Sequence, residues 1–190
     1  LGTKWNLAND NLALNAAIFQ TDKKNKVEAV GAGSSALLYQ TGAVRVKGAE
    51  VGVSGNVTPK LSLAGGAVYM DTNITDSATA SNIGKKLANV AEKSASIQAK
   101  YQTTPKLALG GTVVHTGKIQ GGSFAGDATR ELPSSNRLDL MAEYKLNKKL
   151  STQLNIKNAT DKTIYEAVYR GGFSYVAPGR TTSLSLNYDF

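Results

Sequence analysis

Apolar and polar residues alternate along much of this chain. In residues 182–190, one parity reads Thr, Leu, Leu, Tyr, Phe and the other reads Ser, Ser, Asn, Asp. Successive side chains of a β-strand point to opposite faces, so this pattern predicts a strand with one apolar and one polar face. The same alternation, in places weaker, predicts about nine strands and no helix. The predicted strands are 3–7, 12–20, 49–57, 61–69, 94–101, 107–113, 138–146, 152–156 and 182–190.

The connections between these strands alternate in length. Four short turns contain Asn, Asp, Pro or Lys, and the segments between them are long, polar stretches that we predict to be loops. Transmembrane barrels place short turns on one side of the membrane and long loops on the other, whereas soluble sandwiches distribute loop lengths less regularly. The short turns are 8–11, 58–60, 103–106 and 147–149, and the long loops are 21–40, 71–92, 117–136 and 158–180.

Aromatic residues favour the same interpretation. Trp5, Tyr101, Tyr144, Tyr188 and Phe190 all occupy the apolar parity, a few residues before a short turn or the last residue. Membrane barrels carry aromatic girdles at their interfaces, so we predict that these five side chains form one girdle. A soluble sandwich that buries them as core remains an alternative. The polar parity would then face a hydrated lumen, and its charged members are Lys4, Asp139, Glu143, Lys145, Lys157 and Asp189.

The strand count predicts a part of a barrel. Single-chain bacterial barrels have an even number of strands, whereas about nine are counted here and Leu1 already lies inside an alternating pattern. The expected fold class is therefore all-β, a transmembrane antiparallel β-barrel of which residues 1–190 form the C-terminal part.

Composition excludes several classes of chemistry. The 190 residues include no cysteine and one histidine, so thiolate sites, cysteine nucleophiles and histidine-built metal cages are excluded. His115 lies on the apolar parity, and no motif connects it with Ser123, Asp127 or Ser134, so we expect an interfacial histidine, no enzyme and no cofactor. No segment has the pattern of a signal peptide or a membrane-spanning helix. The net charge of +8 comes from Lys and Arg residues that are spread along the chain and do not alternate with aromatic residues. This favours a solvated or lipopolysaccharide-facing surface over a nucleic-acid-binding one.

Three segments carry a resemblance to a known family. "LGTKWNLANDNLALNAAIFQ" resembles a late barrel hairpin of TonB-dependent siderophore receptors, and "VKGAEVGVSGNVTPKLSLAGGAVYMDTNI" resembles another. The most specific segment is "LNIKNATDKTIYEAVYRGGFSYVAPGRTTSLSLNYDF", which is similar to the closing hairpin, with "NxxNxxDxxY", a loop, "PGR" and a strand ending in an aromatic residue. Ala159 and Thr160 depart from the apolar pair that is usual in the family. The loop before Arg180 is most similar to that of catecholate receptors.

The resemblance implies an outer-membrane receptor of a Gram-negative bacterium that imports ferric siderophores. It implies a barrel of twenty-two strands, with a plug and a TonB box upstream of residue 1. It also implies that TonB supplies the energy, and that the barrel-assembly machinery reads the last strand with Phe190. A passive porin or small structural barrel, and a soluble β-sandwich binding module, remain alternatives.

Substrate recognition is expected in the long loops. Ferric catecholates are anionic and aromatic, so their receptor needs cations that offset charge and rings that stack. Cations and rings occur together in the loops 117–136 and 158–180. Arg180, at the end of the second loop, is left out of the binding set because we expect it to anchor the closing strand. The predicted substrate-binding residues are Lys118, Phe124, Arg130, Tyr169, Arg170, Phe173 and Tyr175.

Overall fold

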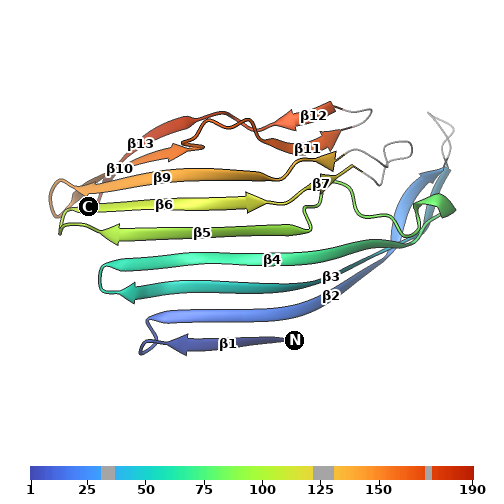
Figure 1. The fold of residues 1–190 in the computed structure, drawn as a ribbon, viewed down its shortest axis with the longest axis horizontal. Helices are drawn as coiled ribbons and strands as arrows, with labels where there is room; N and C mark the ends of the chain where they lie inside the picture. Colours follow the sequence, from blue (N-terminus) through green and yellow to red (C-terminus); the bar gives the residue numbers. More distant parts are fainter. Residues whose placement is uncertain (31–36, 122–130, 170–172) are drawn as a thin grey trace.

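One antiparallel sheet of nine strands dominates the structure, a computed structural model that describes residues 1–30, 37–121, 131–169 and 173–190 (Figure 1). Neighbouring strands follow the order β1-β2-β3-β4-β5-β6-β9-β10-β13, and two small hairpins, β7–β8 and β11–β12, lie beside it. The strands are β1 (Gly2–Leu7), β2 (Leu12–Val30), β3 (Leu37–Thr58), β4 (Leu61–Asp76), β5 (Lys93–Gln102), β6 (Leu107–Thr116), β7 (Ile119–Gln120), β8 (Glu131–Leu132), β9 (Ser135–Lys145), β10 (Leu150–Lys157), β11 (Tyr165–Tyr169), β12 (Phe173–Val176) and β13 (Thr181–Tyr188).

The strand register aligns the apolar parity of each strand with that of its neighbours. Because side chains alternate between the faces, aligned parities give the sheet one apolar and one polar face. The apolar face is open in this chain: Leu184 and Leu186 are 73% and 69% exposed. One cross-strand row of the apolar face consists of Trp5, Leu14, Val53, Gly65, Ile97, Val113 and Leu138.

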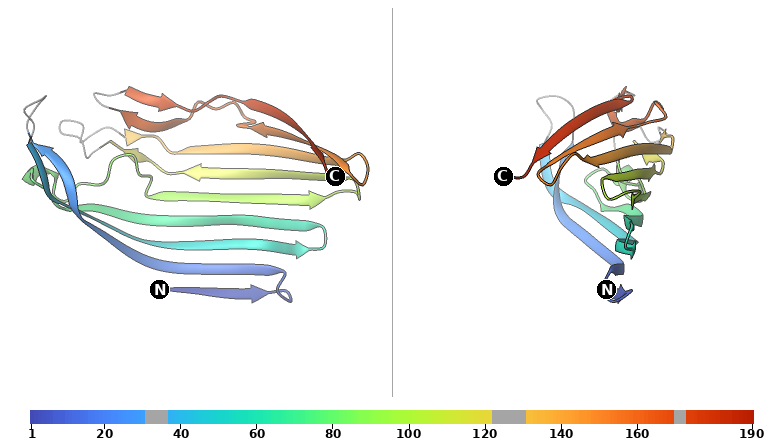
Figure 2. Two further views of the ribbon diagram at one scale, coloured as in Figure 1. Left: turned by 180° about the vertical axis from the view of Figure 1, so that it is seen from behind. Right: turned by 90° about the vertical axis from the view of Figure 1, so that its left-hand side faces the viewer.

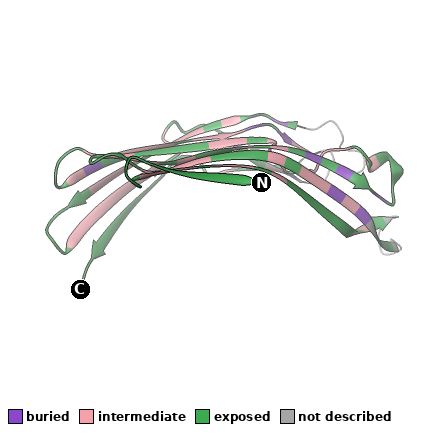
Figure 3. Ribbon diagram, turned by 90° about the horizontal axis from the view of Figure 1, so that it is seen from below, coloured by how far each residue is buried: buried purple, intermediate pink, exposed green. Residues whose placement is uncertain are grey.

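The sheet is curved and open, as expected for part of a barrel wall. Figures 2 and 3 show it as a shallow arch, with β1 and β13 at its two edges. β13 pairs with β10, and β1 pairs with β2, so the chain does not close into a small barrel of its own. In the described ranges no second sheet covers the nine-stranded one, and the sandwich alternative is therefore wrong.

Two of the predicted long loops are partly strand. β2 and β3 continue through most of 21–40, and β4 continues to Asp76, so these three strands extend beyond the rest of the sheet (Figure 1). The prediction failed because charged residues interrupt the apolar parity there, while the buried Val44 and Ile74 lie on the opposite face, although backbone pairing persists. Asp22 and Arg45 are register partners there, with 2.5 Å between Oδ1 and Nε.

The predicted loops 117–136 and 158–180 also contain short strands, which form the hairpins β7–β8 and β11–β12. Strands of two to five residues are too short for alternation to reveal them. In the described residues the helical structure is one 3-10 turn, η2 (Ala80–Asn82), and no helix is long and apolar enough to cross a membrane.

Buried side chains gather at the long-loop end of the sheet (Figure 3). Within the described residues, no second layer covers the sheet. In its middle and toward the short turns, Ala108 is the hydrophobic residue that is buried. The molecule is therefore most densely packed where the loops meet. The buried residues of the long-loop end are Val44, Thr72, Ile74, Ser77, Ile119, Leu132, Asn158, Ile164 and Val168.

Candidate functional site

Asn89 joins three loop segments at the long-loop end. Its side chain donates from Nδ2 to the Val168 carbonyl at 3.0 Å and accepts from the Val168 N–H at Oδ1 at 2.8 Å. Its backbone N–H donates to the Gln120 carbonyl at 2.9 Å. Asn89 adopts the left-handed conformation, with φ of 60°, which asparagine tolerates better than most residues. This single residue therefore holds both hairpins against the segment that follows β4.

A small apolar cluster lies beneath this contact. Ile119 of β7, Leu132 of β8 and Val168 of β11 are buried together, and Ala91 packs against them. Ala91 also forms an isolated β-bridge with Ile119. Four short segments that are far apart in the sequence thus share one core, which positions the loops relative to the sheet.

Lys118 has an acidic partner. Its Nζ lies 3.1 Å from Oε2 of Glu131, and Gln120 donates from Nε2 to Oε1 of the same carboxylate at 3.1 Å. The pair spans the β7–β8 hairpin and stays solvated, since the two side chains are 67% and 41% exposed. Glu131 therefore offsets the charge that Lys118 would offer to an anionic ligand.

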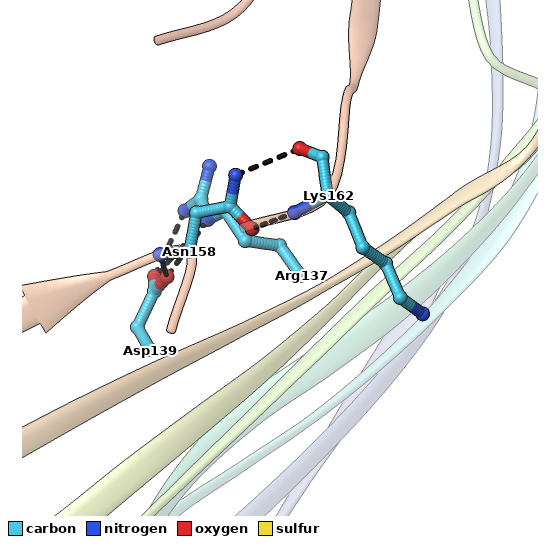
Figure 4. A network of polar contacts seen from close by, with 4 residues as sticks. All are labelled: Arg137, Asp139, Asn158 and Lys162. Carbon is cyan, nitrogen blue, oxygen red and sulfur yellow. Dashed lines mark hydrogen bonds and ion pairs between the residues drawn. The ribbon is translucent and has the colours of Figure 1, made fainter. Parts of the chain in front are cut away.

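Asn158 organises the end of β10 (Figure 4). It is 1% exposed, its N–H donates to Oδ1 of Asp139 at 2.8 Å, and its side chain exchanges two hydrogen bonds with the backbone of Lys162, at 2.8 and 3.1 Å. Arg137 makes a bidentate contact with the same Asp139, at 3.0 Å from Nε and from Nη2. This network ties the last loop to the polar face of β9.

Arg180 anchors the start of the closing strand, as predicted. Its backbone N–H donates to Oδ1 of Asp161 at 2.7 Å, and its guanidinium lies 3.5 Å from the Ala159 carbonyl. A Cβ at Gly179 would lie 3.0 Å from that Asp161 oxygen, so the Pro-Gly-Arg turn leaves little space for a larger residue. The two signature segments of the closing hairpin therefore bind each other.

His115 lies on the apolar face at the loop end of β6. Its Nδ1 is 2.8 Å from Oδ1 of Asn136, its neighbour in the register. Among the described residues no group of three or more His, Cys, Asp or Glu side chains could hold a metal ion. His115 also borders a hollow of about 330 Å³, whose other lining residues are Glu92, Lys93, Gly117, Lys118, Gln120, Glu131 and Ser134.

Comparison with known proteins decides the family. A family model described as "TonB dependent receptor-like, beta-barrel" matches residues 1–159. The chain belongs to the TonB-dependent receptor family. It is 30% identical over its whole length to the probable TonB-dependent siderophore receptor PiuA of Acinetobacter baumannii and covers 26% of that protein. It is 33% identical to the probable TonB-dependent receptor BfrD of Bordetella pertussis, again over its whole length and 26% of the relative.

Solved structures agree with this assignment. The crystal structure of PiuA superposes with a TM-score of 0.85 at 30% identity, over 98% of this chain and 27% of that one. The ferric-catecholate import receptor Fiu of Escherichia coli, in its closed form, gives a TM-score of 0.79 at 27% identity, over 100% and 27%. The chain thus spans about a quarter of the length of these relatives. Membership in the TonB-dependent receptor family favours the receptor alternative over a passive porin.

Three of the predicted substrate-binding residues of this TonB-dependent receptor chain lie on or directly beside the two small hairpins. Lys118 precedes β7, while Phe173 and Tyr175 lie on β12, 74% and 59% exposed. Position 169 pairs with position 173 in the β11–β12 ladder. Asn89 and the apolar cluster connect the two hairpins, so both predicted loops belong to one unit. Phe124, Arg130 and Arg170 lie outside the described residues.

The polar face of the receptor wall carries charges of both signs that pair with one another. Lys100 of β5 contacts Glu143 of β9 across β6, with 2.5 Å between Nζ and Oε2. A Cβ at the intervening Gly110 would come within 2.8 Å of Met141, so that strand has little space for a larger residue. Beside this region lies a hollow of about 450 Å³ lined by Gln98, Gly111, Thr112, Asp139, Leu140, Met141, Gln153, Asn155, Ile156, Lys157 and Ser183.

The five predicted girdle residues lie near the short-turn end. Trp5, Tyr101, Tyr144 and Tyr188 each stand within two residues of the last residue of their strands, and all are 44% to 52% exposed. Phe190 is fully exposed and meets Tyr188 edge-to-face, with ring centroids 5.2 Å apart. The five rings therefore lie at similar heights along their strands.

A second charged cluster lies at the long-loop end, where β4 extends beyond its pairing with β5. Lys86 binds Asp71 and lies 2.7 Å from Oε1 of Glu92. The hydrogen bond from Lys86 lowers the pKa of Asp71, and the hydrogen bonds to Asp71 and then to Glu92 raise the pKa of Lys86. Lys93 lies nearby, with Nζ 5.9 Å from the centroid of the Tyr69 ring.

Sequence reasoning missed Asn89 and Asn158 as residues that build the site. Asn158 stood inside a recognised family pattern, so the pattern marked its position without giving its contacts. Asn89 carried no signal beyond being an asparagine in a polar stretch, a residue type suited to positive φ.

Proposed function

We propose that this chain is part of the outer-membrane wall of a Gram-negative siderophore receptor that imports ferric siderophores of the catecholate type. The observation that carries the proposal is the match over the whole chain to proteins named as siderophore receptors, including the catecholate siderophore receptor Fiu of Escherichia coli. The open apolar face supports the same proposal, because such a face is stable against lipid and unstable in water.

In this proposal residues 1–190 are the C-terminal strands of a plugged barrel of twenty-two strands. The first strand of that barrel would pair with the free edge of β13, because an unpaired strand edge in hydrocarbon is costly. The plug and TonB box would precede residue 1, and TonB would supply energy through them. The polar face, with its paired charges, would line the lumen around the plug.

The loop unit held by Asn89 would receive the siderophore. Phe173 and Tyr175 offer exposed rings, and Arg130 and Arg170 are the proposed cations. Among the predicted substrate-binding residues Lys118 is a weaker candidate, because Glu131 already binds its ammonium group. Arginine suits the role better, since its planar guanidinium presents a fixed fork of donors to catecholate oxygens.

The outer surface just beyond the apolar rows would contact lipopolysaccharide. Lys47 and Lys93 share the parity of the apolar face, close to Tyr69, and both extend that face toward the long loops. Cations at this height would bind the phosphates of lipopolysaccharide. At the opposite end, Trp5, Tyr101, Tyr144 and Tyr188 would form the girdle at the other interface.

Uptake of a radioiron-loaded ferric catecholate by cells that carry the complete receptor tests this function. We expect uptake that requires both the receptor and TonB. The double variant Arg130→Ala/Arg170→Ala should bind the complex about ten-fold more weakly or worse, the scale of lost charged hydrogen bonds. The control Lys148→Ala/Lys149→Ala removes the same charge from the turn between β9 and β10 and should bind normally. Unchanged binding by the first variant would place recognition elsewhere in the receptor.

Removal of Phe190 tests the proposed assembly signal. We expect less assembled receptor in membranes, measured by heat-modifiable mobility, with unchanged affinity in the molecules that do assemble. Normal assembly after the deletion would exclude a signal at this residue.

A further inference from the structure

The apolar face of the sheet is hollowed between β3 and β6. The hollow has a volume of about 420 Å³, and two register partners with small side chains, Ala67 of β4 and Ala95 of β5, lie at its centre. Val51 and Val53 border it on the β3 side, and Val113 borders it on the β6 side. Small side chains between rows of larger ones therefore leave space for a ligand group on the face that is proposed to contact lipid.

The two ends of this hollow differ. Toward the short turns it is bordered by Ile97, which leans over Gly65, because a Cβ at Gly65 would lie 2.8 Å from Cδ1 of Ile97. Toward the long loops it is bordered by His115, the register partner of Ala95. His115 also borders the polar hollow of about 330 Å³ described above. An apolar and a polar hollow thus meet at one histidine.

His115 has an unused acceptor. Its Nδ1 lies 2.8 Å from Oδ1 of Asn136, and because an amide oxygen only accepts, Nδ1 carries the proton. Nε2 of the neutral ring is then an acceptor, and it has no polar partner among the described residues. A hydroxyl group on an otherwise apolar ligand would donate to it.

Two lysines lie on the same face, just beyond the hollow. Lys93 is the register partner of Tyr69, and its Nζ lies 5.9 Å from the centroid of the Tyr69 ring. Because Tyr69 belongs to the apolar parity, this contact places the ammonium group on the apolar face. Lys47 has the same parity, two residues from Ala49, which is the other register partner of Tyr69. Both lysines are exposed, and neither forms an ion pair with another described residue.

The height of Lys93 agrees with the outer interface of a membrane. On β5 it lies eight residues from Tyr101, one of the predicted girdle residues at the short-turn end. Eight residues span about 27 Å along a strand, or about 20 Å across the membrane at the usual tilt, and the apolar band of membrane barrels is about 25 Å tall. If Tyr101 marks the periplasmic interface, Lys93 lies near the outer one. The hollow then lies in the outer half of the band between them.

We propose that this hollow is a groove for one acyl chain of lipid A, the membrane anchor of lipopolysaccharide, and that Lys47 and Lys93 bind the phosphorylated disaccharide to which the chain is attached. The inference rests on the proposed outer-membrane placement and extends the lipopolysaccharide contact proposed above to a defined site. The hydroxyl group of a 3-hydroxyacyl chain donates to Nε2 of His115. The two lysines lie two strand spacings apart, about 10 Å across the sheet, so they can bind separate phosphates.

Complementarity favours lipid A over a phospholipid. Two carboxylates at this end are already paired, because Asp71 and Glu92 both contact Lys86. Lys47 and Lys93 are therefore left to bind an anionic headgroup, and a basic residue at such a surface strengthens association by about five-fold. The chains attached directly to the sugars of lipid A carry a hydroxyl group that can reach Nε2, whereas phospholipid chains carry none.

The test uses the complete receptor, purified in detergent and mixed with equal amounts of bisphosphorylated lipid A and phosphatidylglycerol. Native mass spectrometry counts each lipid that remains bound, and the wild type should retain lipid A in preference. Ala95→Leu fills the hollow and should retain lipid A about three-fold more weakly, the scale of several lost van der Waals contacts. The control Ala99→Leu adds the same side chain to the same strand and face outside the hollow, and it should behave as wild type.

The polar contacts are tested on the same lipids. Lys47→Gln/Lys93→Gln should retain lipid A about ten-fold more weakly or worse, and arginine at both positions should preserve retention. The control Lys148→Gln/Lys149→Gln removes the same charge from the β9–β10 turn at the opposite end and should behave as wild type. His115→Phe keeps an apolar ring without an acceptor, and it should weaken retention of lipid A while leaving that of phosphatidylglycerol unchanged.

Heat-modifiable mobility checks that every variant folds, and the single variant Lys93→Gln, with an expected loss of about five-fold, serves if the double variant does not. Equal retention of lipid A by Ala95→Leu and Ala99→Leu, or no preference of the wild type for lipid A, overturns the inference. Ferric-catecholate binding, measured on the same samples, separates the two proposals. Its absence in the wild type would overturn siderophore import, while a preference for lipid A that Ala95→Leu weakens would still support the groove.

Discussion

The regular sheet and the loop unit at its end are stabilised in different ways. In the sheet, register rows such as that of Trp5, Leu14 and Val53 build one apolar face. Hydrogen bonds between neighbouring strands satisfy the backbone N–H and carbonyl groups. In the loop unit, a few polar side chains replace missing backbone partners, the exposed Asn89 and the buried Asn158 above all. The first region follows from a pattern that tolerates many substitutions, whereas the second depends on individual atoms.

A charge on the apolar face should have the largest effect. Arg in place of Leu186 should lower the free energy of unfolding in lipid vesicles by about 2 to 4 kcal/mol if that site lies near the bilayer midplane. The control is Asn187→Arg on the opposite, polar face, and it should cost little. Equal losses at the two neighbouring positions would show that the faces are not divided between lipid and water.

Removal of the Asn158 side chain is expected to rank second. Asn158→Ala removes two hydrogen bonds between a buried side chain and the Lys162 backbone, which costs about 1 to 3 kcal/mol. The comparison variant Asn187→Ala removes an exposed asparagine and should change stability little. Denaturant unfolding of the reconstituted barrel gives both values. A loss below that of Asn187→Ala would show that the network of Figure 4 does not stabilise the closing loop.

The sequence predicted the sheet well because alternation directly reports a half-apolar strand. All nine predicted strands correspond to strands of the sheet, and the four short turns lie where proline, lysine and asparagine indicated them. Alternation gave no sign of the extension of β2, β3 and β4, since Asp22 and Arg45 interrupt the apolar parity there while the buried Val44 and Ile74 lie on the opposite face.

The candidate site was predictable in part. Composition and family resemblance identified the loops that carry aromatic and basic residues, and the contact of Arg180 with Asp161 agrees with its expected role at the start of the closing strand. The pairing of Lys118 with Glu131 was not predictable, because it requires the two-residue strands of the β7–β8 hairpin. The contact of Asn89 with Val168 joins positions 79 residues apart, which no local pattern reports.

Loss of the Asn89 side chain should affect the loop unit and spare the sheet. Asn89→Ala removes two hydrogen bonds to Val168 and places alanine at positive φ. Backbone amides of β11 should exchange with solvent about five- to ten-fold faster, as expected for about 1 kcal/mol of local stability. Asn89→Gly keeps the backbone conformation and separates the two causes. Unchanged exchange in β11 with both variants would refute the role of Asn89 as the contact between the hairpins.

The smallest expected effect is the pH dependence of the Lys86 contact. Because Lys86 lowers the pKa of Asp71, its contribution is complete above the unfolded carboxyl pKa of about 3.9 and is lost as pH falls through the lower folded value. Because Asp71 and Glu92 raise the pKa of Lys86, the same contact is lost at the alkaline end only as pH rises beyond about 10.4. Protection of amides 77–92 against hydrogen exchange, corrected for intrinsic rates, should therefore stay constant through neutral pH and fall only at the acid and alkaline ends. Lys86→Gln should lower the plateau slightly and flatten both ends, because an exposed ion pair contributes little. A wild-type profile that changes near neutral pH would show that other titrating groups determine the protection of amides 77–92. Asn89 would then be the contact on which the loop unit depends.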